Sequence, residues 1–594
     1  MQPIDWLIVI GYLVLTLGLG VYFSRQSYKN LEDFYASGRS LSWWLAGTSM
    51  AATTFSVDTP LYIAGIVGNR GIAGNWEWWS FGIAHVVMIY LFARLWRRAE
   101  IITDAELSEL RYGGERAKLL RGIKAFLFAV PINCIGIGYA MLAMAKVLDV
   151  LQLWQLFGLD ATTHNLKLWS VMFLGALVII YAGVSSLWTV VASDLFQFWL
   201  ALLGSIVVAG ASVSAVGGLR PMMEYFTTTS PDVLSIMPFS WEDGLQWQAI
   251  AGIPSSTFFA YVFLQWWSFR RSDGGGEFVQ RLTAARSEKE AEKAAWLFNI
   301  LHYGVRTWPW IVTALAAIIL FPDLPDKELG YPLLMVNYLP PIVLGLVVTS
   351  LLAAFLSTAS TLINWGASYI ANDLYKRFLS HRASQGELLF AGRVASLLIT
   401  AIGCFAAFIT NDIATLFRLA IAIGTGPGIV LILRWFWWRI NATAELAAIL
   451  AGFFIGFFTS VGPGFIIEDF GQRLLLITVV TTVVWVVALL ITPPESDETL
   501  DRFYAKIRPG GPGWQQQRER TGLRPLQNLA LDGQKVVAAS LLLFGSMVSF
   551  GGFLMLRSLT GFFALIIAVG GGYWLKQLNK QPAFPTPRPG TEDG

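Results

Sequence analysis

Hydroxyl, carboxyl and proline residues interrupt an otherwise apolar segment near the start of the chain. Between Gly47 and Gly71 the polar positions gather at the middle, and they are Thr53, Thr54, Ser56, Asp58, Thr59 and Pro60. A carboxylate and a proline at bilayer depth are tolerated only where the backbone opens onto a protein-lined or water-filled cavity. The pattern therefore predicts a broken membrane helix with a ligand site at the break.

A second polar cluster lies in an apolar segment between residues 351 and 378. Its members follow helical spacing, so most share one face, and they are Ala354, Ser357, Thr358, Thr361, Asn364 and Ser368. Serine and threonine in membrane helices also bond to the carbonyl four residues earlier or allow close packing. The chemical alternative is that Ser357 and Thr358, with carbonyls released after Ala52, supply the hard oxygen ligands that sodium needs.

The composition places these clusters in a polytopic membrane protein. Of the 594 residues 55% are hydrophobic and 14% charged, and the mean hydropathy is +0.57, which is too apolar for a soluble globular chain. The four histidines and two cysteines form no metal-ligand cluster, so we expect no cofactor. Basic residues are sorted by loop and form no patch, which argues against nucleic-acid binding.

Apolar runs of about 20 residues predict fifteen membrane helices. They lie near residues 6–23, 41–66, 74–93, 123–148, 168–184, 187–215, 247–268, 295–320, 334–372, 387–410, 413–436, 442–461, 474–492, 535–556 and 559–575. The first run follows Asp5 and precedes Arg25, the reverse of a signal peptide, so we expect it to stay as a helix with its N-terminus outside. An odd number of spans puts the C-terminus in the cytoplasm.

Lysine and arginine support this orientation independently of hydropathy. Six loops that the fifteen-helix arrangement places inside hold 29 basic residues, whereas all outer segments together hold 6. Basic residues concentrate in the cytoplasmic loops of membrane proteins. We therefore expect a multi-pass protein of the plasma (inner) membrane.

The parts outside the predicted spans are short. The loop 493–533 holds an amphipathic piece, and the tail 577–594 is rich in proline and is expected to be disordered. Neither is long enough to fold as a catalytic or kinase domain. Function is therefore expected in the membrane part, and the protein is not expected to be an enzyme.

Three motifs and one loop resemble the sodium:solute symporter family over roughly residues 5–495. The motifs are Ala52-Thr53-Thr54-Phe55-Ser56, the stretch YAGVSSLWTVVASDLFQ at 181–197, and Ala354-x-x-Ser357-Thr358 followed by Asp373-Leu374-Tyr375-Lys376. The stretch EFVQRLTAARSEKEA at 277–291 resembles the family's Gln-Arg loop. Together these patterns are specific.

The resemblance implies an all-helical, leucine-transporter-type fold with a five-plus-five inverted repeat. The core halves would be residues 41–215 and 245–437. The extra parts would be the N-terminal helix and loop within 1–40, two helices within 442–492, the cytoplasmic loop 493–533 and two C-terminal helices within 534–576.

The same resemblance implies a sodium site. Its ligands would be the carbonyls of Ala52, Phe55 and Ala354 and the hydroxyls of Ser357 and Thr358. Asp194 would attract the ion along its inward exit path. The alternative for Asp194 is an interfacial carboxylate satisfied by Ser193 or Gln197.

The expected substrate cavity departs from that of sugar-transporting members. Glu77 falls near their hydroxyl-binding glutamate and His302 where they have a lysine, whereas position 59 is Thr and position 419 is Leu where they have glutamines. Thr54 and Thr59 would face the cavity. Trp266 is a candidate for stacking on substrate or for an inner gate, and the other tryptophan clusters are expected in interfacial belts.

Asp58, Arg306 and Arg418 are ionisable at membrane depth and each needs a partner or water. One interpretation is that Arg306 or Arg418 pairs with Glu77 or Asp58 to pin helices. The other is that an arginine clamps a substrate carboxylate while a carboxylate or His302 holds a polar group. In that case the substrate is an organic acid, an amino acid or an acidic sugar.

These observations predict sodium-coupled import of a small polar solute by alternating access. The expected partners are the solute (an organic acid, amino acid or sugar), the sodium ion and the lipid bilayer. Proton coupling through Asp58, Glu77 or His302 is the first alternative. A transporter-like membrane sensor and a passive channel are further alternatives.

Overall fold

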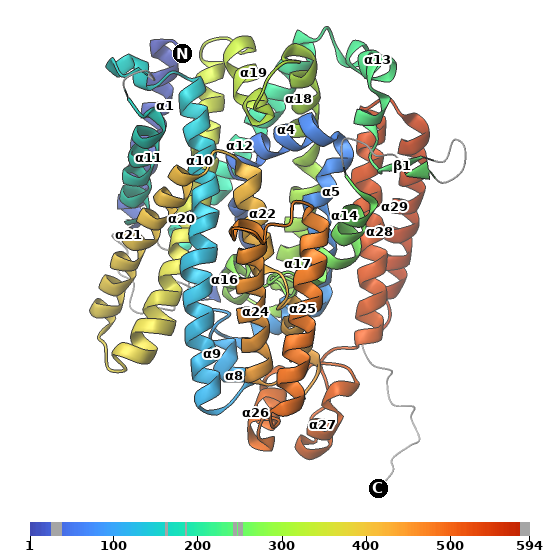
Figure 1. Cartoon of the computed structure of the whole chain (residues 1–594). Helices are drawn as coiled ribbons and strands as arrows, with labels where there is room; N and C mark the ends of the chain where they lie inside the picture. Colours follow the sequence, from blue (N-terminus) through green and yellow to red (C-terminus); the bar gives the residue numbers. More distant parts are fainter. Residues whose placement is uncertain (25–38, 161–163, 184–186, 241–245, 248–252, 583–594) are drawn as a thin grey trace.

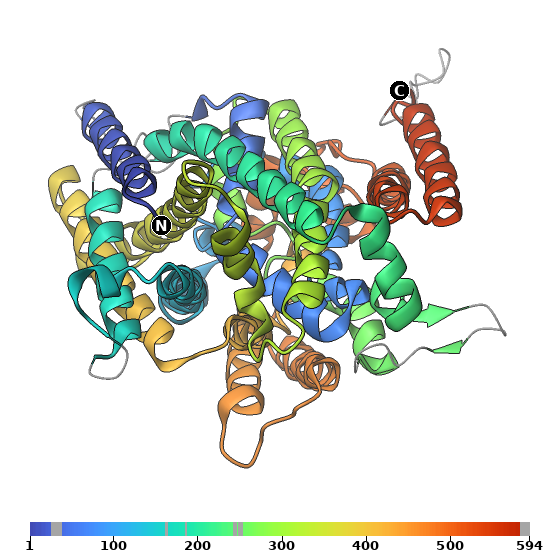
Figure 2. The ribbon, with the colours of Figure 1, turned by 90° about the horizontal axis from the view of Figure 1, so that it is seen from above.

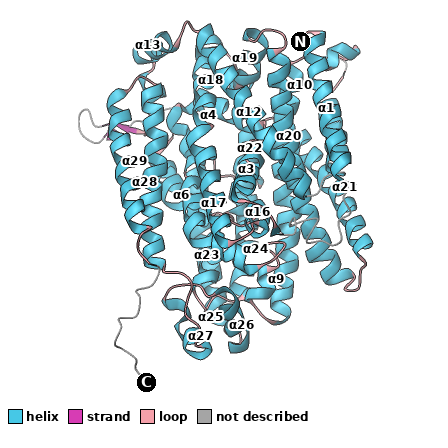
Figure 3. Cartoon of the chain, turned by 180° about the vertical axis from the view of Figure 1, so that it is seen from behind, coloured by secondary structure: helices cyan, strands magenta, loops and turns pink. Residues whose placement is uncertain are grey.

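The computed structural model describes residues 1–24, 39–160, 164–183, 187–240, 246–247 and 253–582. The described chain is almost entirely helical, as Figure 3 shows by its colours, and its long helices run side by side in one bundle (Figure 1). Helix α1 (Pro3–Ser24) begins at the upper end of the bundle in Figure 1, whereas α26 (Asp497–Ile507) and α27 (Gln515–Thr521) lie at the lower end.

Ten helical stretches in the described residues are long and apolar enough to cross a membrane. They are Ile72–Ala99, Gly114–Val150, Asp194–Ala215, Glu288–Leu320, Val343–Leu379, Gln385–Ile409, Ala442–Val461, Phe470–Ile491, Leu529–Leu554 and Ser558–Leu578. A multi-pass membrane protein is therefore confirmed.

Several of these stretches combine consecutive elements. The first joins η2 (Ile72–Asn75), α5 (Trp76–Trp79), α6 (Phe81–Val87), the π-helical η3 (Met88–Phe92) and α7 (Ala93–Ala99). The second joins α9 (Gly114–Leu127), η4 (Phe128–Ile132) and α10 (Asn133–Val150). The others are α12 (Leu187–Ala215), α17 (Glu288–Asn299) with η9 (Ile300–Val305) and α18 (Thr307–Leu320), α20 (Val343–Ser368) with η11 (Tyr369–Leu379), α21 (Gln385–Ile409), α24 (Ala442–Val461), α25 (Phe470–Ile491), α28 (Leu529–Leu554) and α29 (Ser558–Leu578).

The predicted broken helix is present as two helices that meet at an angle. Helix α3 (Trp43–Thr53) and α4 (Asp58–Arg70) pass the length and hydropathy test only together, and they are bent by 55° at the break. Polar residues and Pro60 at the break explain this bend, since proline lacks the N–H that would continue the helical ladder. Counting the pair as one span gives up to eleven spans in the described residues.

The predicted count of fifteen spans is not confirmed, because several apolar runs hold shorter or broken helices. The run 247–268 contains α14 (Ser255–Phe259), η8 (Ala260–Gln265) and α15 (Trp266–Ser268), and the chain then turns through Gly274 and Gly276, whose φ angles are +77° and +85°. The run 413–436 divides into α22 (Ile413–Gly424) and α23 (Gly428–Phe436) at Gly426, with φ of +111°, and Pro427. Hydropathy alone does not detect these breaks.

Two further predicted spans, α1 and α11 (Leu166–Gly183), are apolar but shorter than the ten long stretches over their apolar part. The remaining elements are shorter and connect the long helices. They are α8 (Leu107–Arg111), α13 (Leu219–Thr229), α16 (Glu277–Ala284), α19 (Gly330–Tyr338), the short 3-10 turns η5 (Trp154–Phe157), η6 (Pro231–Leu234), η10 (Lys327–Leu329) and η12 (Pro512–Trp514), and an antiparallel strand pair β1 (Phe239–Ser240) and β2 (Gln246–Trp247). The expectation of an all-helical chain is thus right except for this two-stranded hairpin.

The loop 493–533 contains the helices α26 and α27. Its helix α26 packs Phe503 against the guanidinium of Arg111, which also lies 4.9 Å from the ring of Trp514. Arg111 donates to the carbonyl oxygens of Arg434 and Ile440. Cation–π contacts and hydrogen bonds therefore fix this loop on the bundle. The proline-rich tail predicted to be disordered lies mainly outside the described residues.

Helix α20 occupies the centre of the bundle. Of its most apolar stretch 89% is buried inside the protein, and it packs against α12, α10 and α3. In the view from above, α28 and α29 form a pair at one edge of the molecule (Figure 2). The central helix and the broken helix therefore share an interior position, which places both polar clusters in one region.

Candidate functional site

The break after α3 lies in the protein interior. Helix α3 ends at Thr53, and the N–H of Phe55 donates to the carbonyl of Ala52 at 2.9 Å. The Thr54 hydroxyl donates to the carbonyls of Met50 and Ala51, at 3.2 and 3.0 Å. Both Ala52 and Phe55 are buried, at 2% and 1% exposure, so these carbonyls are removed from bulk water.

Helix α20 places its hydroxyl pair directly against this break. Thr358 donates to the carbonyl of Thr53 at 3.1 Å, and Ser357 donates to the carboxylate of Asp194 at 2.6 Å. Ala354, one turn earlier on α20, is also buried. The two segments that the sequence selected are thus adjacent in space, and sodium binding by their oxygens remains a prediction.

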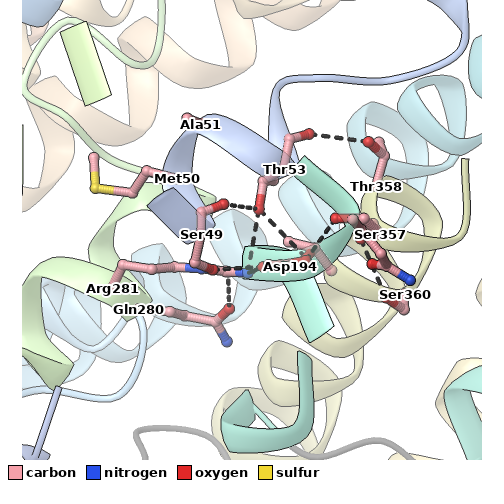
Figure 4. A network of polar contacts seen from close by, with 12 residues as sticks. Ser49, Met50, Ala51, Thr53, Asp194, Gln280, Arg281, Ser357, Thr358 and Ser360 are labelled. Atoms are coloured by element: carbon pink, nitrogen blue, oxygen red, sulfur yellow. Dashed lines mark hydrogen bonds and ion pairs between the residues drawn. The ribbon is translucent and has the colours of Figure 1, made fainter. Parts of the chain in front are cut away.

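Asp194 of α12 forms the centre of a buried polar network (Figure 4). Ser49 donates to one of its oxygens at 2.5 Å, Ser357 donates to the other, and an Arg281 nitrogen lies 3.7 Å from the carboxylate. Gln197, the partner considered from the sequence, donates instead to a tyrosine hydroxyl at 2.9 Å. Asp194 is therefore held by the broken helix and by α20.

Arg281 of α16 was recognised from the sequence only as part of a loop motif. Its guanidinium donates to the hydroxyls of Ser49, Thr53 and Thr361 at 3.1, 3.2 and 2.9 Å. A protein-borne cation thus lies beside the predicted ion site and contacts hydroxyl groups of the same two helices, α3 and α20. No sequence spacing signals this, since the residues come from three separate helices.

A cavity of 170 Å³ lies next to the break. Six of the eight predicted substrate residues line it, and they are Thr54, Asp58, Thr59, Trp266, His302 and Arg306. Glu77 and Arg418 do not line the cavity. The sequence therefore identified many of the polar groups of this cavity, and their role in binding remains a prediction.

Aromatic side chains form much of the cavity wall. Trp78 is 7% exposed and stacks on Tyr303 with ring centroids 5.9 Å apart. We expected the tryptophans near residue 78 in an interfacial belt, and this is wrong for Trp78 and Trp79, because both are buried in the interior. The belt pattern and a cavity wall use the same residue types, so the sequence did not separate them.

Thr54, His302 and Arg306 form a chain of contacts along the cavity. The Thr54 hydroxyl lies 2.9 Å from Nδ1 of His302, and the Arg306 guanidinium contacts the same imidazole ring. Arg306 also donates to the carbonyl of Ala51 at 3.0 Å. This arginine thereby connects the cavity to the backbone of the broken helix.

Glu77 and Arg418 form a separate cluster that pins helices. Arg418 donates to both Glu77 oxygens at 2.8 and 2.9 Å, a bidentate pair, and Arg70 lies 3.0 Å away. The hydroxyls of Tyr62 and Tyr261 donate to the same carboxylate at 2.9 and 3.0 Å. The interpretation that an arginine pins Glu77 therefore describes this pair, and their predicted contact with substrate is not supported by the cavity lining.

The region has no group in the described chain that matches a transition-metal site. Among the residues that the structure describes, no group of three or more His, Cys, Asp or Glu side chains could hold a metal ion. The available ligands are instead hydroxyls, carbonyls and single carboxylates. Such oxygens suit a hard monovalent cation better than a soft metal.

The comparisons with known proteins agree with this geometry. The model of the sodium:solute symporter family matches residues 34–452. A sodium/glucose cotransporter of Vibrio parahaemolyticus is 26% identical over 493 residues, covering 77% of this chain and 86% of that protein. Sodium/glucose cotransporter 1 of Oryctolagus cuniculus is 24% identical over 486 residues, covering 76% and 70%. The solved substrate-bound, outward-open structure of a Na⁺-coupled sialic acid symporter superposes with a TM-score of 0.65 at 19% identity, covering 83% of this chain and 99% of that one, which shows a shared fold.

Proposed function

Because this chain belongs to the sodium:solute symporter family, we propose that it imports a small polar solute together with sodium by alternating access. Its relatives are transporters, not enzymes, and its fold is of the leucine-transporter type. We place the two inverted halves at residues 41–215 and 245–437. The N-terminus is proposed to lie outside the plasma membrane and the C-terminus in the cytoplasm.

The proximity of the α3 break and the α20 hydroxyl pair carries this proposal. The sodium ligands are the carbonyls of Ala52, Phe55 and Ala354 and the hydroxyls of Ser357 and Thr358. In the structure Ser357 and Thr358 donate to Asp194 and to the Thr53 carbonyl. When sodium binds, each hydroxyl offers a lone pair to the ion while its proton stays on its present acceptor, because a hydroxyl has one donor and two acceptor lone pairs.

Asp194 and Arg281 act on the ion from the inner side of this site. The Asp194 carboxylate attracts sodium, whereas the nearby Arg281 guanidinium repels it. The pair keeps the network near electrical neutrality when sodium is absent. Release toward the cytoplasm then proceeds past Asp194.

The solute binds in the neighbouring cavity, and sodium favours the arrangement in which that cavity is complete. Thr54 touches His302 in the cavity, and the carbonyl of Ala52 two residues earlier is a proposed sodium ligand. Occupancy of the ion site therefore fixes the backbone that presents the solute groups, which is how two ligands couple through one broken helix.

The membrane potential supplies part of the driving force. An inward-negative potential of about 100 mV contributes about 2.3 kcal/mol for each sodium ion. This corresponds to about fifty-fold accumulation of a neutral solute at one ion per solute, before the sodium gradient is added. Transport needs no covalent step.

The test is uptake into proteoliposomes with imposed gradients. We expect an inward sodium gradient to drive accumulation of a radiolabelled solute selected by its effect on thermal stability. Substitution of both sodium hydroxyls, Ser357→Ala with Thr358→Ala, should abolish the sodium requirement or the uptake. Full uptake driven by a pH step in sodium-free buffer would overturn sodium coupling in favour of protons.

A further inference from the structure

Two side chains of opposite charge line the solute cavity. Within the described residues, no ion pair joins them. They belong to Asp58, the first residue of α4, and Arg306, which lies between η9 and α18. Each lies at membrane depth, where an uncompensated charge is costly. The surroundings of the two groups show what each still requires.

The Asp58 carboxylate is only partly satisfied. Its Oδ1 atom is buried and has no hydrogen-bond partner among the described residues. The start of α4 gives it a helix N-terminus, which supplies partial positive charge and no counter-ion. A buried carboxylate on a cavity is compensated when a ligand brings a cationic donor.

The Arg306 guanidinium has neutral partners. It donates to the carbonyl of Ala51 and contacts the ring of His302, and it lies over the rings of Phe55 and Trp310 at 5.6 and 5.4 Å. Its Nε atom is buried without a hydrogen-bond partner in the part of the chain that the structure describes. None of these contacts neutralises its charge, so a ligand carboxylate is its natural complement.

Two more arginines shape the electrostatic potential of the cavity. Arg270 and Arg271 also line it, and Arg270 lies over the rings of Phe128, Phe269 and Trp365 at 5.3 to 5.6 Å. Their charges disfavour a solute that carries only a cation. The required cationic group must therefore come with a carboxylate in the same molecule.

We propose that the transported solute is a zwitterion that carries a carboxylate and an ammonium group, as an amino acid does. This proposal rests on the proposed function as a sodium-coupled symporter. Asp58 accepts hydrogen bonds from the ammonium group, and Arg306 donates to the carboxylate. The aromatic wall that includes Trp78 and Tyr303 contacts an apolar side chain.

The size of the cavity agrees with this class. A volume of 170 Å³ corresponds to about six waters at the liquid share of about 30 Å³ each, which is room for a small solute. We use L-phenylalanine as the reference probe, because three analogues keep its ring and remove one function each. L-3-phenyllactate replaces the ammonium with a hydroxyl, 3-phenylpropionate removes it, and 2-phenylethylamine removes the carboxylate.

The first experiment measures thermal stabilisation of the purified full-length protein in sodium and in potassium buffer. The panel holds the standard L-amino acids, glycine betaine, the three phenyl analogues, D-glucose and sialic acid. We expect sodium-dependent stabilisation by at least one zwitterion, with an affinity at least about tenfold above that of its analogues lacking one charge. Equal or stronger binding of D-glucose, sialic acid, the hydroxy acid or either single-charge analogue overturns the proposal.

The second experiment assigns the charges to their residues. With Asp58→Asn, which mimics a neutral acid in shape, we expect the preference for the best zwitterion over its ammonium-free analogue to fall below about threefold. With Arg306→Gln we expect the preference over the carboxylate-free analogue to fall likewise, and Arg306→Lys should recover part of it. Retention of the wild-type preference in Asp58→Asn overturns the proposal.

Matched controls separate this proposal from the function on which it rests. Asp149→Asn and Arg393→Gln remove the same charges at exposed positions outside the cavity, and both should keep the wild-type preference.

Stabilisation by sodium alone reports that each variant is folded and that its ion site is intact. Sodium stabilisation with no zwitterion response overturns the zwitterion assignment alone, whereas loss of every sodium effect in the wild type overturns sodium coupling.

Discussion

Two carboxylates of the membrane part, Glu77 and Asp58, differ in how completely the protein surrounds them. Glu77 receives two arginines and two tyrosine hydroxyls, and its side chain is fully buried. Asp58 lies on a cavity with a buried oxygen that has no hydrogen-bond partner in the described chain. Both carboxylates lie in apolar segments that look alike by hydropathy.

The difference indicates which carboxylate stabilises the fold and which one is available to bind a ligand. A carboxylate with all of its hydrogen bonds made gains nothing from a solute, and removing it leaves its partners uncompensated. A carboxylate with an unmade bond on a cavity has capacity for a ligand. We therefore regard Glu77 as a helix pin and Asp58 as a binding residue.

Substitution of Glu77 should produce the largest loss of stability. Glu77→Gln leaves Arg418 and Arg70 without their counter-charge, and breaking a buried pair in this way costs about 3–5 kcal/mol. We expect a large fall in the melting temperature of the detergent-purified protein. Glu224→Gln, at an exposed position of α13, is the control and should melt like the wild type. A wild-type melting temperature for Glu77→Gln would remove the distinction between the two carboxylates.

The proposed ion site predicts that substitution of its two hydroxyls weakens ion binding. Ser357→Ala with Thr358→Ala removes two proposed sodium oxygens and should weaken sodium-dependent stabilisation about ten- to hundredfold, or about 1.4–2.8 kcal/mol. Sodium titration of the melting temperature measures this. Ser396→Ala, a hydroxyl on α21 that bonds within its own helix, is the control. Undiminished sodium affinity in the double variant would contradict the proposed ion site.

Glu328 of η10 lies outside the membrane spans, and its carboxylate is only partly neutralised. Lys146 forms ion pairs with both Glu328 and Asp326, so the two carboxylates share one positive charge. Burial and the neighbouring Asp412 carboxyl raise the pKa of Glu328 from 4.5 to about 7, although Lys146 opposes this shift. Its folded pKa lies above the unfolded value, so the native state holds a proton between about pH 4.5 and 7 that the unfolded chain releases. The free energy of unfolding should therefore fall as pH rises through this window, by about 2–3 kcal/mol.

The pH dependence of the melting temperature measures this effect. In Glu328→Gln the decline between pH 5 and 7 should be largely absent, because the amide holds no titrating proton. The exposed Glu224→Gln should keep the wild-type slope. An unchanged slope in Glu328→Gln would place the titration elsewhere.

Asp58→Asn should have the smallest effect on stability. Within the described residues Asp58 forms no salt bridge, and only the longer-range charge of Arg306 acts on it. The free energy of unfolding of Asp58→Asn in solute-free buffer should therefore stay within about 1 kcal/mol of the wild type or rise. The melting temperatures of Asp58→Asn and Glu77→Gln are compared in the same assay. A collapse of Asp58→Asn as large as that of Glu77→Gln would make Asp58 a structural residue.

The sequence predicted the chemical identity of the site better than its boundaries. Polar residues in apolar segments identified both the broken helix and the hydroxyl pair of α20, since such residues are costly in lipid wherever they occur. The same rule identified Asp58, Arg306 and Arg418, but left their pairing open. Which arginine faces which carboxylate depends on packing between distant helices, and one sequence contains no record of it.

Other features could not be predicted for physical reasons. The fifteen-span count treated each apolar run as one helix, whereas Gly426 and Pro427 divide one run and the glycine-containing turn at 274–276 follows a short one. Arg281 was missed because its hydroxyl partners lie on other helices. The aromatic cavity wall was missed because tryptophan is equally suited to a membrane interface.

The most direct test of the account is solute-dependent entry of ²²Na⁺ into proteoliposomes held at an inward-negative potential. For the wild type we predict that addition of the solute identified by thermal stabilisation accelerates ²²Na⁺ uptake, and that Ser357→Ala with Thr358→Ala abolishes this acceleration. Accumulation of the same solute with no accompanying ²²Na⁺, in vesicles that retain their potential, would contradict sodium-coupled symport.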